Sequence, residues 1–199
     1  MPGPLEARLR AALRQPARPS SDYDLNTGIT LPAERVLRPA AVLVGVQDHP
    51  TGARVVLTKR ASHLRNHPGQ IAFPGGRQDA GDVDMAATAL REAQEEIALP
   101  AGAVQVLGTL PAHETVTGFQ VTPVLALIAP DVEFVPEASE VAEIFTVPLS
   151  HLCNPACFQV EKRRWRGVWR YYYVVPWGPY YIWGATARIL RGLADRITP

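Results

Sequence analysis

The chain has 199 residues, of which 47% are hydrophobic and 20% charged, so it suits one globular domain with its own core. Its 20 Lys and Arg residues nearly balance 19 Asp and Glu residues, which excludes a protein that coats nucleic acid or a membrane surface by charge. Two cysteines make no disulfide framework, no secretory signal is present, and no apolar run approaches the roughly 18 residues of a membrane span. We therefore expect a cytoplasmic protein with neither nucleic acid nor a membrane as partner.

The N-terminal segment predicts a helix followed by an arm. Leu5, Leu9 and Leu13 recur every four residues, which is typical of a short amphipathic helix, and Pro16 ends it. Residues 17–38 are rich in proline and polar residues and show no period, so they predict a surface arm. We expect residues 1–38 to pack on a single domain that spans residues 39–199.

The rest of the chain alternates between strands and helices. Residues 40–46 and 54–58 are apolar runs around a turn and predict an antiparallel hairpin. A long loop over 60–81 leads to a helix over 84–97. Downstream we expect strands at 104–110, 121–128 and 144–148, a strand or strand pair at 165–175, and a helix at 185–197. This order predicts an α/β fold whose mixed, partly antiparallel sheet is covered by helices.

The helix over 84–97 carries an acidic stripe. At about 100° per residue, Glu92, Glu95 and Glu96 gather on one side, beside a stripe that consists mainly of alanine. Like-charged helix neighbours repel by about 0.2 to 0.5 kcal/mol a pair, and a divalent cation such as Mg²⁺ or Mn²⁺ removes that repulsion. The alternative is a solvated face that Arg91 partly neutralises from one turn before Glu95.

A glycine pair precedes the acidic helix. Gly75 and Gly76 follow Pro74 and have no side chain to keep a ligand away from their backbone carbonyl or N–H groups. Together with the three glutamates, a carbonyl of Gly75 or Gly76 predicts a metal site. Such a site neutralises a polyphosphate and lowers the pKa of a bound water.

These residues resemble the Nudix hydrolase signature, G-x5-E-x7-R-E-U-x-E-E-x-G-U, where U is a bulky aliphatic residue. Gly76 and the run REAQEEIAL at 91–99 match it, with a segment between them that is one residue longer. Asp82 is the expected substitute for the first glutamate, Ala93 occupies the first U position, and Ala98 replaces the late glycine. The resemblance implies a Nudix-like α/β/α sandwich and a metal-dependent pyrophosphohydrolase.

Residues 56–76 are similar to the motif of the coenzyme A pyrophosphatase subgroup, L-L-T-x-R-[SA]-x3-R-x3-G-x3-F-P-G-G. Only the first leucine differs, since Val56 occupies its position. This resemblance implies hydrolysis of the pyrophosphate bond of coenzyme A (CoA) or acyl-CoA with Mg²⁺ or Mn²⁺. The products would be 3′,5′-ADP and 4′-phosphopantetheine or its acyl form.

The resemblance also implies roles for the acidic residues. Glu92 and Glu96 would be the main metal ligands, Glu95 a further or bridging ligand, and Arg91 would orient Glu95. A carboxylate outside the signature would accept a proton from the attacking water. Glu140 is the first candidate for this base, followed by Glu114 and Glu143; each has the alternative of being an ordinary loop acid.

Cations in the subgroup motif are candidates for binding phosphate. Arg60 and Arg65 offer forked donors, and Lys59, His67 and Gly69 belong to the same loop; the alternative is a solvated basic loop. The aromatic-rich region over 165–183 could stack adenine or border a pantetheine channel, but we favour a place in the core or at a dimer surface, so a homodimer is possible.

Two other functions stay open. The chain could hydrolyse another nucleoside diphosphate derivative such as NADH or ADP-ribose. It could also be a binding module that senses CoA or a nucleotide without catalysis, although such a module could dispense with the three glutamates. RNA decapping is disfavoured because no basic stripe extends across the sequence.

Overall fold

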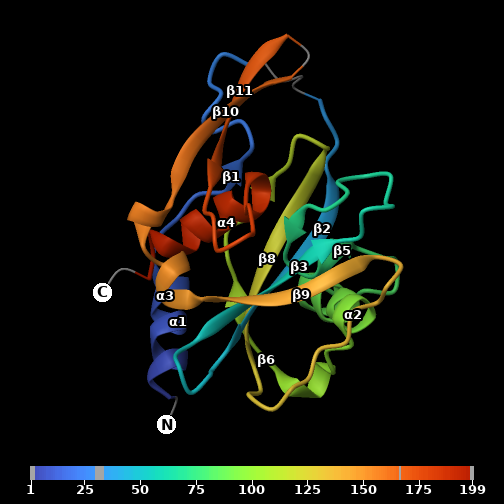
Figure 1. Cartoon of the computed structure of the whole chain (residues 1–199), viewed down its shortest axis with the longest axis vertical. Coiled ribbons are helices and arrows are strands. Elements are labelled where there is room, and N and C mark those ends of the chain that lie inside the picture. Colours follow the sequence, from blue (N-terminus) through green and yellow to red (C-terminus); the bar gives the residue numbers. More distant parts are fainter. Residues whose placement is uncertain (1–2, 30–33, 166, 198–199) are drawn as a thin grey trace.

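The structure, a computed structural model, describes residues 3–29, 34–165 and 167–197 (Figure 1). A central sheet lies between α2 (Met85–Ile97) on one face and α4 (Gly184–Ala194) with α1 (Pro4–Arg14) on the other. This confirms the predicted α/β/α architecture with a mixed sheet. Residues 30–33 of the predicted arm lie outside the described residues.

Strand β2 (Arg38–Gln47) is the centre of the sheet. It runs parallel to β8 (Phe119–Ile128) along its whole length. On its other side it pairs antiparallel with β3 (Arg54–Arg60) at one end and with β5 (Gly75–Arg77) at the other. The predicted antiparallel hairpin is therefore confirmed. The other strands of this sheet are β1 (Ser20–Ser21), β4 (Ile71–Ala72), β6 (Val104–Thr109), β7 (His113–Glu114) and β9 (Val141–Pro148).

The core divides into two layers because strand side chains alternate between the faces of the sheet. From β2, Ala41 and Leu43 point toward α2, whereas Val44 and Val46 point toward α4. All four side chains are buried. The sheet therefore holds the two helices at fixed positions on opposite faces.

Two predictions of element bounds are wrong. The expected loop over 60–81 contains β4 and β5, since edge-to-edge pairing with β3 and β2 satisfies its backbone. The final helix ends at Ala194 rather than at residue 197.

Short elements complete the chain: α3 (Leu149–Leu152) and two 3₁₀ turns (Ala101–Ala103 and Pro155–Cys157). No helix in the described ranges is long and apolar enough to cross a membrane.

The aromatic-rich region forms a hairpin that projects beyond the main sheet (Figure 1). Strands β10 (Gln159–Trp165) and β11 (Val168–Val174) pair only with each other as a separate two-stranded sheet. Trp165 and Trp169 are 46% and 52% exposed. These two rings therefore lie outside the core, whereas Tyr173, Trp177 and Tyr180 pack against it as expected. A place for the exposed rings at a dimer surface stays a prediction.

The predicted surface arm supports the middle of this hairpin, where Tyr171 pairs with Lys162. The buried Asn26 side chain accepts a hydrogen bond from the Tyr171 N–H and donates one to the Tyr171 carbonyl, at 2.9 Å each. An amide side chain thus takes the place of a neighbouring strand at the edge of β11. The sequence of the arm has no hydrophobic period and did not indicate this contact between Asn26 and the hairpin.

Candidate active site

Helix α2 carries the three glutamates against the sheet. Asp84 caps its first turn by accepting the Ala87 N–H at 2.7 Å, and Ala98 ends it in a left-handed conformation. Ala89 and Ala93 are fully buried against the sheet, so the helix axis lies close to it. The predicted alanine stripe is therefore the packing face, and the glutamates emerge beside β5.

The glycine pair lies in a strand and not in a loop. Gly75 and Gly76 pair with Val42 and Ala41 of β2. Gly75 has a φ of 155°, and a Cβ atom there would meet the Ala41 carbonyl oxygen and the Val42 backbone. A Cβ on Gly76 would lie 2.5 Å from the Glu92 carboxylate. Gly75 needs glycine because backbone atoms occupy its side-chain space, whereas at Gly76 that space is taken by the Glu92 carboxylate, the far end of a flexible side chain.

Glu96 is the most deeply placed of the three glutamates. Only 5% of the residue is exposed, and its Oε2 accepts a hydrogen bond from the Gly75 N–H at 3.2 Å. Burial raises the pKa of Glu96 to about 7, and the nearby Glu92 charge adds to this effect. Burial also raises the pKa of Glu92. These two carboxylates therefore face the glycine pair in a setting that disfavours negative charge.

Glu95 lies apart from the other two. Its side chain is 60% exposed and pairs with Arg91 at 3.2 Å. In the described part of the chain, no three His, Cys, Asp or Glu side chains gather closely enough to hold a metal ion as they stand. Glu92 and Glu96 thus lie against Gly75 and Gly76, whereas the Glu95 side chain does not reach this group.

Arg91 has a larger role than the predicted orientation of Glu95. Its Nε and Nη2 atoms each donate to the Asp82 carboxylate at 3.0 Å, while Nη1 donates to Glu92 at 3.0 Å. The Arg91 guanidinium holds the pKa of Asp82 well below its usual range. The Asp82–Arg91 pair therefore fixes one side of Glu92, and the substitution of Asp82 for the first glutamate of the signature stays a prediction.

Glu140 is the candidate base that the structure leaves nearest the glutamates. It is exposed, and its negative charge contributes to the raised pKa values of Glu92 and Glu96. Its loop is tied to both sides of the site: the Ala61 N–H donates to the Glu140 carbonyl at 2.8 Å, and the Glu137 N–H donates to the Glu96 carbonyl at 2.9 Å.

The other two candidate bases have partners of their own. Glu114 forms an ion pair with Arg35 at 2.7 Å. Glu143 accepts a short hydrogen bond from the Tyr180 hydroxyl, and the Tyr180 ring stacks on Phe145. Their oxygens are engaged in holding strands and loops together, which favours Glu140 as the proton acceptor.

The predicted basic loop divides into two groups. Arg60 and His67 line a cavity of about 260 Å³ between the sheet and the start of α4, whereas Lys59 and Arg65 are exposed and do not line it. Arg60 also lies near enough to Glu96 for its charge to oppose the rise in the pKa of that group. Gly69 has a turn role: its φ is 69°, and its N–H donates to the Arg60 carbonyl at 3.1 Å.

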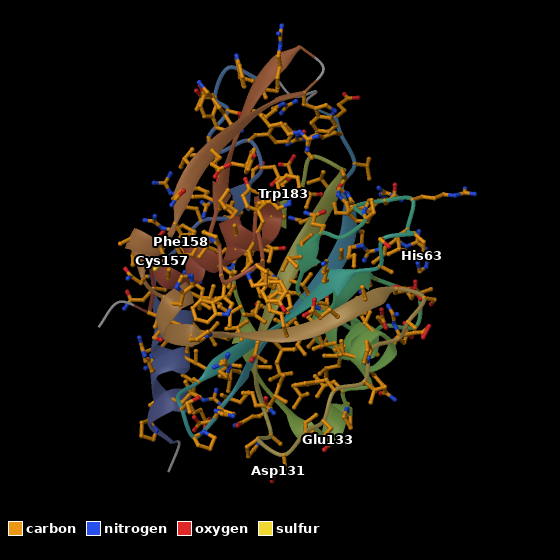
Figure 2. All side chains as sticks on the ribbon, in the orientation of Figure 1. His63, Asp131, Glu133, Cys157, Phe158 and Trp183 are labelled. Atoms are coloured by element: carbon orange, nitrogen blue, oxygen red, sulfur yellow. The ribbon has the colours of Figure 1, made fainter. Side chains whose placement is uncertain are left out.

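Several cavity residues come from distant parts of the chain. Gln70 lies within the subgroup motif and Trp183 belongs to the aromatic-rich region, so their positions could have suggested them, but Asp22 carries no local signal. The β7–β8 turn adds Thr115 and Thr117. Figure 2 shows Trp183 between the projecting hairpin and the main sheet. His63, in the loop that follows Arg60, lies at the opposite edge of the molecule from α1 and α3.

Comparison with known proteins decides the family. The family profile of the NUDIX domain matches residues 36–168, which is more than half of the chain. The chain belongs to the Nudix family. This Nudix protein is 45% identical over 165 residues to a protein of Enterobacter sp. (strain 638) named as an uncharacterized Nudix hydrolase NudL, with 80% of this chain and 83% of that protein covered. A protein of the same name from Cronobacter sakazakii is 46% identical over 164 residues, with the same coverage.

Solved structures agree on the Nudix fold. The NUDIX domain of NrtR from Shewanella oneidensis, solved with ADP ribose, aligns with a TM-score of 0.53 at 16% identity and covers 89% of this chain and 97% of that one. A MutT/nudix family protein from Enterococcus faecalis aligns with a TM-score of 0.50 at 13% identity, covering 99% and 75%. At these identities the likeness concerns the fold. Together with the family match, it makes this chain a Nudix hydrolase.

Proposed function

We propose that this Nudix hydrolase cleaves the pyrophosphate bond of CoA or acyl-CoA with Mg²⁺ or Mn²⁺, yielding 3′,5′-ADP and 4′-phosphopantetheine or its acyl form. The position of Arg60 carries the proposal. This arginine belongs to the motif that resembles CoA pyrophosphatases, lines the cavity, and acts electrostatically on Glu96. A cation of that motif thus lies near Glu96 and also borders the cavity, which supports the cavity as the place where the substrate would bind.

The glutamate face of α2 fits a hard divalent cation. Glu92 and Glu96 would hold it through carboxylate oxygens, with a carbonyl of Gly75 or Gly76, and with Glu95 if it leaves Arg91. The missing Cβ of Gly76 leaves room at the Glu92 carboxylate, and a cation offsets the cost of burying the Glu96 charge. When bound, the metal would neutralise charge on the diphosphate and lower the pKa of a water molecule.

The protein's own groups supply the remaining steps. Arg60 donates to diphosphate oxygens and offsets their charge. Glu140 accepts a proton as the water oxygen attacks phosphorus and the bond to the bridging oxygen breaks, so that each product keeps one of the two phosphates. Asp82 and Arg91 keep Glu92 in place during this reaction.

Product analysis tests the function directly. The purified protein is incubated with CoA and Mg²⁺ or Mn²⁺, and the mixture is separated by chromatography. We expect 3′,5′-ADP and 4′-phosphopantetheine in equal amounts. Faster hydrolysis of NADH or ADP-ribose would reject CoA as the preferred substrate, and tight CoA binding without products would support the non-catalytic alternative.

A matched pair of variants tests the role of Arg60. Arg60→Ala should raise KM for CoA about tenfold, since it removes a charge-assisted contact, whereas Arg65→Ala should change KM less than about twofold. The ratio of KM for CoA to KM for dephospho-CoA then shows whether Arg60 binds the 3′-phosphate or the diphosphate. Unchanged KM values for both substrates in Arg60→Ala would refute its role.

A further inference from the structure

A second, smaller cavity adjoins the one that Arg60 lines. The two share Asp22, Val116, Trp183 and Gly184, so they lie side by side with common walls. The smaller cavity, which we call the aromatic pocket, has a volume of about 100 Å³ and extends along the projecting hairpin as far as Trp165, the last residue of β10 before the turn. Its other walls come from Asn26 and from Trp165, Arg170, Tyr171 and Tyr172.

The aromatic pocket holds an unsatisfied hydrogen-bond donor. Arg170 Nε is buried and has no hydrogen-bond partner in the described part of the chain. The Arg170 guanidinium lies 5.5 Å from the ring centre of Tyr23 and 5.9 Å from that of Trp165. A buried donor without an acceptor is costly, so this position favours a ligand that brings a hydrogen-bond acceptor to Arg170.

The size of the aromatic pocket limits the ligand. Its volume of about 100 Å³ is less than half of the roughly 260 Å³ of the cavity that Arg60 lines, so it suits a short section of a slender chain better than a purine nucleoside. Aromatic rings from both sides favour apolar atoms in that chain. The Asp22 carboxylate, held by the Val116 N–H at 2.8 Å and by His113 at 3.1 Å, lines the aromatic pocket, and its negative charge favours a neutral acceptor at Arg170 over a phosphate.

We infer that the aromatic pocket binds the amide-bearing pantetheine arm of the substrate, with one amide carbonyl accepting from Arg170, and that the nucleotide end lies elsewhere. A pantetheine arm combines methyl and methylene groups with two amides, which matches aromatic walls and a single donor. This inference rests on the proposed function. It makes the projecting hairpin a determinant of substrate specificity.

Inhibition by the two product halves tests the inference. Inhibition constants of 4′-phosphopantetheine and 3′,5′-ADP against CoA hydrolysis are measured for wild type, Arg170→Met and Trp165→Ala. Trp169→Ala is the matched control, because Trp169 is as exposed as Trp165 but does not line the pocket and faces Lys162 at 5.0 Å. Thermal melts confirm that each variant is folded.

We expect the inhibition constant of 4′-phosphopantetheine to rise about tenfold in Arg170→Met and Trp165→Ala, with that of 3′,5′-ADP within about twofold of wild type. Trp169→Ala should change neither constant. A rise confined to 3′,5′-ADP would place the nucleotide end in the pocket and overturn the inference, as would no change in either constant. If wild type leaves CoA intact, the proposed function fails, and calorimetric binding of 4′-phosphopantetheine to wild type and Arg170→Met still decides the inference.

Discussion

Gly76 lies directly beneath the Glu92 carboxylate, so a Cβ atom at position 76 would be 2.5 Å from both of its oxygens. The strand that contains Gly76 and the helix that contains Glu92 approach each other at this point. The obstructed group is the far end of a flexible side chain and can move aside. A methyl group at position 76 would therefore displace the carboxylate and leave the fold intact.

Gly76→Ala should lower kcat/KM about a hundredfold, because a shift of about 1 Å in a reactive group has that effect. Its melting temperature should stay close to wild type. Gly81→Ala is the control, since a Cβ there meets no atom within 4 Å. Equal activity of the two variants would show that the position of Glu92 is not critical.

Glu96→Gln should stabilise the metal-free protein at high pH. Folding raises the pKa of Glu96 from 4.5 to about 7. Below pH 4.5 Glu96 is protonated in both the folded and the unfolded protein, so it does not reduce the free energy of unfolding. As the pH rises through 7, the folded protein must hold a buried charge, and the free energy of unfolding falls. A neutral amide avoids that loss, which amounts to roughly 3 kcal/mol at pH 8. Denaturant unfolding at pH 4.5 and pH 8 measures the difference.

The control for this experiment is Glu95→Gln, whose exposed side chain should affect stability little at either pH. Added Mg²⁺ should raise the melting temperature of wild type at pH 8 but not that of Glu96→Gln. Equal stability of wild type and Glu96→Gln at pH 8 without metal would mean that Glu96 is not held in a desolvated position.

Asp82→Asn should reduce activity about tenfold to a hundredfold, the range typical of residues that hold metal ligands in place. The variant leaves Arg91 without its charged partner, and Arg91 then holds Glu92 less firmly. Asp79→Asn is the comparison, because Asp79 is 59% exposed and lies 3.9 Å from Arg91. Asp82→Glu, which restores a carboxylate at this position, should keep the activity that Asp82→Asn loses.

Glu140→Ala should lower kcat by about a hundredfold or more with little change in KM, as expected for loss of a general base. Added formate should restore part of the rate, because a small carboxylate can enter the space and accept the proton. Glu114→Ala and Glu143→Ala should show no such recovery, since both side chains already have partners. Rescue of Glu143→Ala instead would move the base to β9.

The sequence by itself determined the parts of the site that depend on neighbours within a few residues. Helical periodicity places Glu92 and Glu96 on one side of α2, and the glycine pair marks a close backbone approach. These features are local, because one helix turn or one dipeptide encodes them. The two-layer core was also predictable, since alternation along β2 requires cover on both faces.

Only the tertiary structure decided which distant groups meet. Pairing between strands showed that Gly75 and Gly76 form part of the sheet and placed Arg60, but not Arg65, at the cavity. Asp22 and Trp183 reach the same cavity from opposite ends of the chain. The aromatic-rich sequence around Trp183 allowed a place beside a ligand, but no local pattern showed that the two residues meet. Strand order and helix placement are long-range properties, so the substrate space emerged only when the sheet was assembled.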